Sequence, residues 1–131
     1  MNYIDYKILK YNNMIFAGIP GYDIFYKERD FNIHNFSNSF NLPDKIFSIL
    51  LSHEPPSPWF YEDHDCGSLM VKKFLEMHRF SLVVTGHIHV KKPRYDKTIN
   101  LISVINPGAN GVLININENI GEYKVLFEHR I

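Results

Sequence analysis

Two short apolar segments that each stop at a histidine constrain the fold most strongly. Residues 46–51 run into His53, and residues 81–85 lead to His87. Between them, residues 67–79 place apolar side chains at helical spacing, with charged side chains on the remaining face. A strand, a crossover helix and a second strand form a βαβ unit with parallel strands. The sequence therefore predicts both histidines at one sheet edge, where ligands bind in open α/β sheets.

The rest of the chain predicts a mixed β-sheet of the α/β class. Asn12-Asn13 can adopt the positive φ angles of a tight hairpin turn. Residues 19–43 predict a long loop with one short helix, because proline, glycine and charged residues interrupt the pattern. The strands predicted outside the βαβ unit are residues 4–10, 14–18, 98–105, 111–117 and 122–128. The last of these strands are predicted to be antiparallel and to extend the mixed sheet at its C-terminal end.

Length and composition exclude several classes of protein. With 131 residues and 45% hydrophobic side chains, residues 1–131 form one domain with a core. No run of 18 apolar residues is present, so we expect no membrane span. The 14 basic and 14 acidic residues cancel, so net charge does not indicate nucleic-acid binding. Lys91, Lys92 and Arg94 either attract a phosphate group or form a solvated turn. One cysteine and no visible signal peptide predict a cytoplasmic protein.

Four landmarks in one order resemble the second half of the calcineurin-like metallophosphoesterases. They are Ser52-His53-Glu54-Pro55-Pro56, the helix start Gly67-Ser68, Gly86-His87-Ile88-His89, and Asn106-Pro107-Gly108. The resemblance implies half of a four-layer sandwich, a divalent metal (manganese, zinc or iron) and a phosphate ester as the substrate. It also implies that His53 and His87 hold one metal ion and that His89 holds its neighbour.

Other residues near these landmarks are candidates for supporting roles. Glu54, His64, Gly86 and Asn106 are candidates for orienting the metal-binding residues or contacting the substrate. His64 has a second interpretation as a cap of the helix that follows, as do Asp65 and Ser68. Gly86 is expected to allow a tight backbone path, and Asn106-Pro107-Gly108 to form a turn near the site.

The family's first half contributes three further motifs, and none of them is found in this sequence. Asp-x-His, Gly-Asp-x-x-Asp and Gly-Asn-His are all missing. Two divalent ions about 3.5 Å apart repel by about 19 kcal/mol at an effective dielectric constant of about 20, and neutral imidazoles do not offset this. We therefore expect a truncated or split domain that binds metal weakly or not at all. A homodimer or a partner chain is expected to cover the sheet face left open.

Three functions fit these observations. The first is metal-dependent hydrolysis of a phosphoric ester, with the missing ligands supplied by another chain. The second is an inactive binding or regulatory relative of the same family. The third places His87-Ile88-His89 in another metal fold, such as a metallo-β-lactamase or an amidohydrolase. The third is disfavoured, because Val90-Lys91 follows the pair and the pair lies late in the chain.

Overall fold

The two apolar segments form neighbouring central strands of the sheet. The computed structural model describes residues 4–21 and 26–128. Strand β3 (Phe47–Ser52) is followed by helix α2 (Leu69–Met77) and strand β6 (Leu82–Thr85). β3 and β6 pair in parallel, with Ser52 opposite Thr85. The predicted βαβ unit is confirmed, and Ser68 is the N-cap of its helix because its side chain accepts a hydrogen bond from the Val71 amide.

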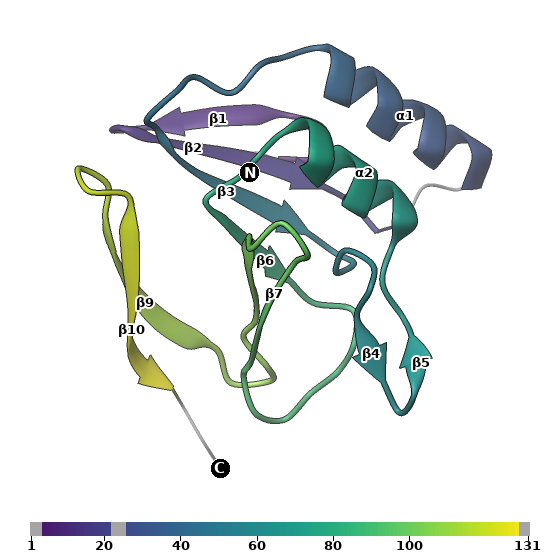
Figure 1. Cartoon of the computed structure of the whole chain (residues 1–131), viewed down its shortest axis with the longest axis vertical. Helices are drawn as coiled ribbons and strands as arrows, with labels where there is room; N and C mark the ends of the chain where they lie inside the picture. Colours follow the sequence, from purple (N-terminus) through teal and green to yellow (C-terminus); the bar gives the residue numbers. More distant parts are fainter. Residues whose placement is uncertain (1–3, 22–25, 129–131) are drawn as a thin grey trace.

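Two further parallel strands flank this pair (Figure 1). β2 (Met14–Ile19) pairs with β3, and β8 (Ser103–Asn106) pairs with β6. β1 (Ile8–Tyr11) and β7 (Arg94–Lys97) close the two edges in antiparallel orientation, which gives the order β1-β2-β3-β6-β8-β7. Because four neighbouring strands run in the same direction, their carboxyl ends meet at one edge of the sheet.

Helix α1 (Tyr26–Asn38) corrects the prediction of a long loop with one short helix for residues 19–43. It has 13 residues and connects β2 to β3, so it forms a second crossover beside α2. Ile33 and Phe36, three residues apart, are buried, and the Phe36 ring stacks on Phe74 of α2 at 5.6 Å. Most of the remaining helix positions are polar, so packing against α2, rather than a strong sequence pattern, stabilises this helix.

The C-terminal strands also differ from the prediction. The segment predicted as one strand over 98–105 contains a turn, and β7 precedes it at Arg94–Lys97. β9 (Val112–Asn117) and β10 (Glu122–Glu128) form a separate two-stranded sheet instead of extending the mixed sheet. Their apolar side chains Ile114, Ile116 and Tyr123 pack on a face of the main sheet. This hairpin therefore forms a partial second layer.

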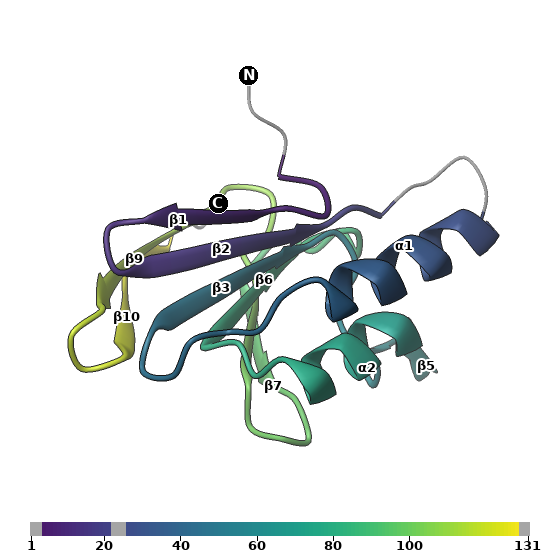
Figure 2. The same cartoon turned by 90° about the horizontal axis from the view of Figure 1, so that it is seen from above.

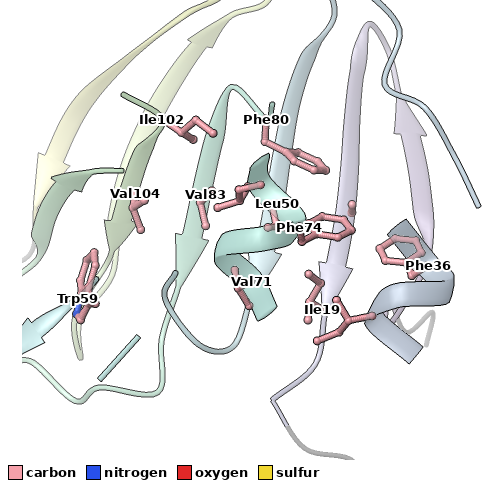
Figure 3. Close-up of a cluster of buried hydrophobic side chains, with 13 residues drawn as sticks. Ile19, Phe36, Leu50, Trp59, Val71, Phe74, Phe80, Val83, Ile102 and Val104 are labelled. Carbon is pink, nitrogen blue, oxygen red and sulfur yellow. The ribbon is translucent and has the colours of Figure 1, made fainter. Parts of the chain in front are cut away.

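Alternation along the strands separates two apolar clusters. On one face, α1 and α2 lie side by side and cover Ile19, Leu50, Val83 and Val104, as Figures 2 and 3 show. The opposite face carries Phe47, Ile49, Leu82 and Ile105, against which the β9–β10 hairpin packs. Neither helix in the described ranges is long and apolar enough to cross a membrane.

Candidate functional site

His53 and His87 meet at the carboxyl edge of the central strands. His53 follows β3 directly, and His87 lies two residues beyond the end of β6. The Nε2 atom of His53 is 3.0 Å from the Nδ1 atom of His87, a hydrogen bond in which one ring donates and the other accepts. The ring centroids are 4.9 Å apart at an interplanar angle of 59°. Both side chains are exposed, so the pair is accessible to a ligand.

The neighbouring strands fix the backbone of His53. Its amide donates to the Ile19 carbonyl of the β2 end at 3.1 Å. Its carbonyl accepts from the Gly86 amide and from the Thr85 hydroxyl, both at 3.2 Å. The two backbone hydrogen bonds continue the sheet pairing by one residue past β3, and the Thr85 hydroxyl adds a third contact, so the position of the imidazole depends on its side-chain torsions alone.

His87 adopts a left-handed backbone conformation, with φ of 63°. Ile88 donates its amide to the Gly86 carbonyl at 2.7 Å, which closes a tight turn around His87. The prediction that Gly86 provides the tight backbone path is wrong: Gly86 has no positive φ, and a Cβ there would meet no atom within 4 Å. A non-glycine residue at positive φ costs about 1 kcal/mol, and such conformations cluster at functional sites.

Asn106 connects the histidine loop to the end of β8. The side chain is 4% exposed, and its Nδ2 donates to the Ile88 carbonyl at 2.8 Å. Its Oδ1 accepts from the Gly108 amide at 3.0 Å, in a turn where Gly108 has φ of 73°. The predicted turn near the site is therefore confirmed. Asn106 holds the peptide between His87 and His89, and both of its side-chain hydrogen bonds go to the backbone rather than to the imidazole pair.

In the part of the chain that the structure describes, the remaining predicted site residues form no metal-binding group with the histidine pair. His89 is exposed and lines, with His87 and Asn106, a hollow of about 350 Å³. Glu54 is half-buried, and its carbonyl accepts from the Ser52 hydroxyl at 2.6 Å. His64 lies in the small hairpin of β4 (Phe60–Tyr61) and β5 (His64–Asp65), and Ser68 rather than His64 caps α2. Within 4–21 and 26–128, no three His, Cys, Asp or Glu side chains form a group able to hold a metal ion.

The distance between the two nitrogens is compatible with two ligands of one metal ion. Two nitrogens bound to zinc at about 2.0–2.1 Å lie about 2.8–3.4 Å apart at octahedral or tetrahedral angles. The observed 3.0 Å between Nε2 and Nδ1 lies in that range. Two imidazoles provide only half of a four-coordinate shell and no negative charge. The described residues thus fit part of a single-ion site, and they do not fit a two-metal centre.

Asp65 organises the loop that leads from His53 to α2. It accepts hydrogen bonds from the Ser57 hydroxyl and from the Trp59 and Gly67 amides. The Ser57 hydroxyl, followed by the two amides, lowers the pKa of the Asp65 carboxyl below its usual value. Of the basic cluster, Arg94 packs over the Trp59 ring at 3.9 Å and donates to the Phe60 carbonyl. It therefore supports this loop.

A comparison with models of known protein families gives a match whose residues include the histidine pair. The family model described as calcineurin-like phosphoesterase matches residues 3–91, which is more than half of the chain and includes both histidines of the pair. The chain belongs to the calcineurin-like phosphoesterase family. A search among curated proteins found no match.

Two solved structures share the fold. The crystal structure of TT1561 of Thermus thermophilus matches with a TM-score of 0.54 and 13% identity, covering 93% of this chain and 57% of that one. A second structure matches with a TM-score of 0.62 and 13% identity, covering 94% of this chain and 52% of that one. The chain therefore spans little more than half the length of either structure. At this identity the likeness concerns the fold alone.

Two residues of the site were not singled out by the sequence. Thr85 donates to the His53 carbonyl, and Gly21 lies against the His53 ring. Thr85 ends β6 and Gly21 lies two residues beyond the end of β2, at the same sheet edge as the histidines. Their position at strand ends is a signal that sequence reading could have used. Their contacts with His53 depend on strand register, which the sequence alone does not give.

Proposed function

We propose that this chain provides the His53–His87 side of a metal-dependent phosphoesterase centre, which hydrolyses a phosphoric ester when another chain supplies the remaining ligands. The observation that supports this most directly is the 3.0 Å approach of the two imidazole nitrogens at the carboxyl edge of parallel strands. Membership of the calcineurin-like phosphoesterase family supports the reaction class.

Each residue would have a different role in such a site. His53 and His87 would each offer one nitrogen to the same ion, and Asn106 would hold the loop that carries His87. His89, two residues further, would bind a neighbouring ion or the substrate. A bound divalent ion supplies an activated water at neutral pH and polarises the phosphoryl oxygen. Because imidazoles suit zinc and iron while carboxylates suit manganese, zinc or iron is the favoured ion.

The alternative is a binding or regulatory relative without catalysis. The observation that favours it is the lack of a third ligand beside the pair among the described residues. Such a protein would keep the fold and a weak metal site but would not turn over substrate. For either function we place the protein in the cytoplasm, since its single cysteine excludes a disulfide within the chain.

Metal binding and hydrolysis distinguish these functions. Calorimetric titration with Zn²⁺ should show binding by the wild-type chain, and His53→Ala or His87→Ala should each abolish it. His89→Ala should retain it, because His89 forms no metal-binding group with the pair among the described residues. Hydrolysis of bis(p-nitrophenyl) phosphate should appear only with metal present. Zinc binding without turnover would favour the regulatory alternative, and equal zinc binding by wild type and both pair variants would refute the site.

A further inference from the structure

Gly21 lies where a side chain would collide with the metal-binding imidazole. A Cβ atom built on Gly21 would be 1.9 Å from Cδ2, 2.3 Å from Cγ and 2.7 Å from Cβ of His53. Ordinary carbon contacts are about 3.5–4.0 Å, so the His53 ring occupies the space that any side chain at position 21 would need. The backbone of Gly21 therefore passes directly against the His53 side chain.

Position 21 needs a glycine because its backbone lies so close to the His53 side chain. The backbone conformation at this position does not itself require glycine. Gly108, Gly111 and Gly121 have positive φ angles, which favour glycine for conformational reasons. Gly21 has no such angle. A residue with a side chain could adopt the same backbone conformation, but it could not do so beside His53.

A side chain at position 21 could be accommodated only if the His53 ring moved, because the backbone of His53 is fixed. Its backbone is bonded to the Ile19 carbonyl on one side and to Gly86 and Thr85 on the other. Rotation about χ1 would move Cγ and Cδ2 away from position 21, but it would also carry Nε2 away from His87. Gly21 therefore leaves the space in which the His53 ring adopts the orientation that places the two nitrogens 3.0 Å apart.

From these contacts we infer that Gly21 is a positioning residue for His53: because it has no side chain, it leaves open the ring orientation that brings His53 to His87, and so permits the imidazole pair that a divalent ion would need. This inference rests on the proposed function for its link to metal. The orientation itself can be measured without metal. Position 21 therefore acts through His53 and does not touch the ion.

The test compares Gly21→Ala with Gly121→Ala. Gly121 lies in the turn between β9 and β10, with φ of 68° and open space around it. Gly121→Ala should therefore lower the free energy of unfolding through backbone strain, at a position away from the site. Gly21→Ala should weaken Zn²⁺ binding by about tenfold or more, as loss of a ligand's supporting contact does. Gly121→Ala should leave Zn²⁺ affinity unchanged. NMR spectra of the imidazole nitrogens should show shifted His53 and His87 signals only in Gly21→Ala.

A double-mutant cycle gives a readout that needs no metal. Gly21→Ala should lower the urea midpoint of unfolding, and part of that loss should disappear in a His53→Ala background, because the two closest atoms, Cγ and Cδ2, are then gone while Cβ at 2.7 Å remains. Additive losses, or unchanged imidazole signals in Gly21→Ala, would overturn the inference. If the wild-type chain binds no zinc, the proposed function fails, while the NMR and unfolding measurements still decide the role of Gly21.

Discussion

Asn106 is a buried amide whose two hydrogen bonds fix the loop that carries His87. Its donor group bonds to the Ile88 carbonyl, and its acceptor group bonds to the Gly108 amide. Burial makes both bonds important, since a buried group that loses its partner keeps its desolvation cost. The left-handed conformation of His87 is held between this anchor and the tight turn to Gly86.

Replacing Asn106 with alanine should therefore affect both stability and metal binding. We expect Asn106→Ala to lower the free energy of unfolding by about 1–3 kcal/mol, because the Ile88 carbonyl and Gly108 amide lose their partners. Zn²⁺ affinity should fall as well, since His87 is no longer held. Urea denaturation and calorimetric titration measure the two effects.

The control is Asn117→Ala at the end of β9. Asn117 makes a similar bond, from the Asn119 amide to its Oδ1 at 3.2 Å, but on an exposed turn. Loss of this hydrogen bond in Asn117→Ala should lower the free energy of unfolding by about 0.5 kcal/mol or less and should leave zinc binding unchanged. Equal stability of Asn106→Ala and wild type would show that Asn106 does not anchor the loop.

At the scale of elements, the loop from His53 to α2 is held by one carboxylate. Asp65 accepts three hydrogen bonds that fold Ser57, Trp59 and Gly67 around it, just before the helix cap at Ser68. The β4–β5 hairpin and the Arg94 contact with Trp59 complete this segment. The loop therefore sets where α2 begins relative to β3.

The lowered pKa of Asp65 predicts a pH-dependent contribution to stability. Since the folded protein favours the charged carboxylate, its contribution is complete above the ordinary pKa of about 4 and is lost as the pH falls through the lowered folded value. Asp65→Asn should destabilise the protein at neutral pH by about 1 kcal/mol, a value reduced by solvent exposure. Urea denaturation over a pH series should show the difference from wild type shrinking in acid.

Asp63→Asn is the matched control for this measurement. Asp63 lies in the same hairpin at a positive φ of 67°, which asparagine tolerates. Its substitution should leave stability within about 0.5 kcal/mol of wild type at every pH. A pH-independent effect of Asp65→Asn would mean that its charge does not stabilise the loop.

At the scale of the whole molecule, the second face of the sheet is only partly covered. Strand register places Leu9 and Tyr11 of β1 on the same face as Phe16 and Ile49, which belong to the cluster under the β9–β10 hairpin. Leu9 is 54% exposed and Tyr11 is 62% exposed. The chain spans 57% and 52% of the two solved structures with this fold. Contiguous exposed apolar surface of this kind normally marks an interface.

We expect a second copy of the chain to cover this surface. Sedimentation velocity should show association that increases with protein concentration, because burial of apolar surface drives it. Replacing Leu9 and Tyr11 together by lysine and serine should weaken association. Ile99→Lys, which changes an apolar residue that is 74% exposed in the turn before β8, should not. A monomer at all concentrations would contradict the expectation.

The sequence by itself determined the βαβ unit, the parallel direction of its strands and the shared sheet edge of His53 and His87. These features follow from local patterns, since hydrophobic periodicity fixes element type and the crossover rule fixes direction. The same patterns predicted the β9 and β10 strands and the Asn106 turn. Helix α1 was underestimated, because its stability comes from buried Ile33 and Phe36 packed on α2 rather than from an amphipathic pattern.

Only the tertiary structure decided which side chains touch. His53 and His87 are 34 residues apart in sequence, and their contact depends on the register between β3 and β6. The left-handed conformation of His87, the space that Gly21 leaves for His53 and the packing of the β9–β10 hairpin on the second face depend on packing as well. Long-range contacts are set by register and close packing, which no local pattern encodes.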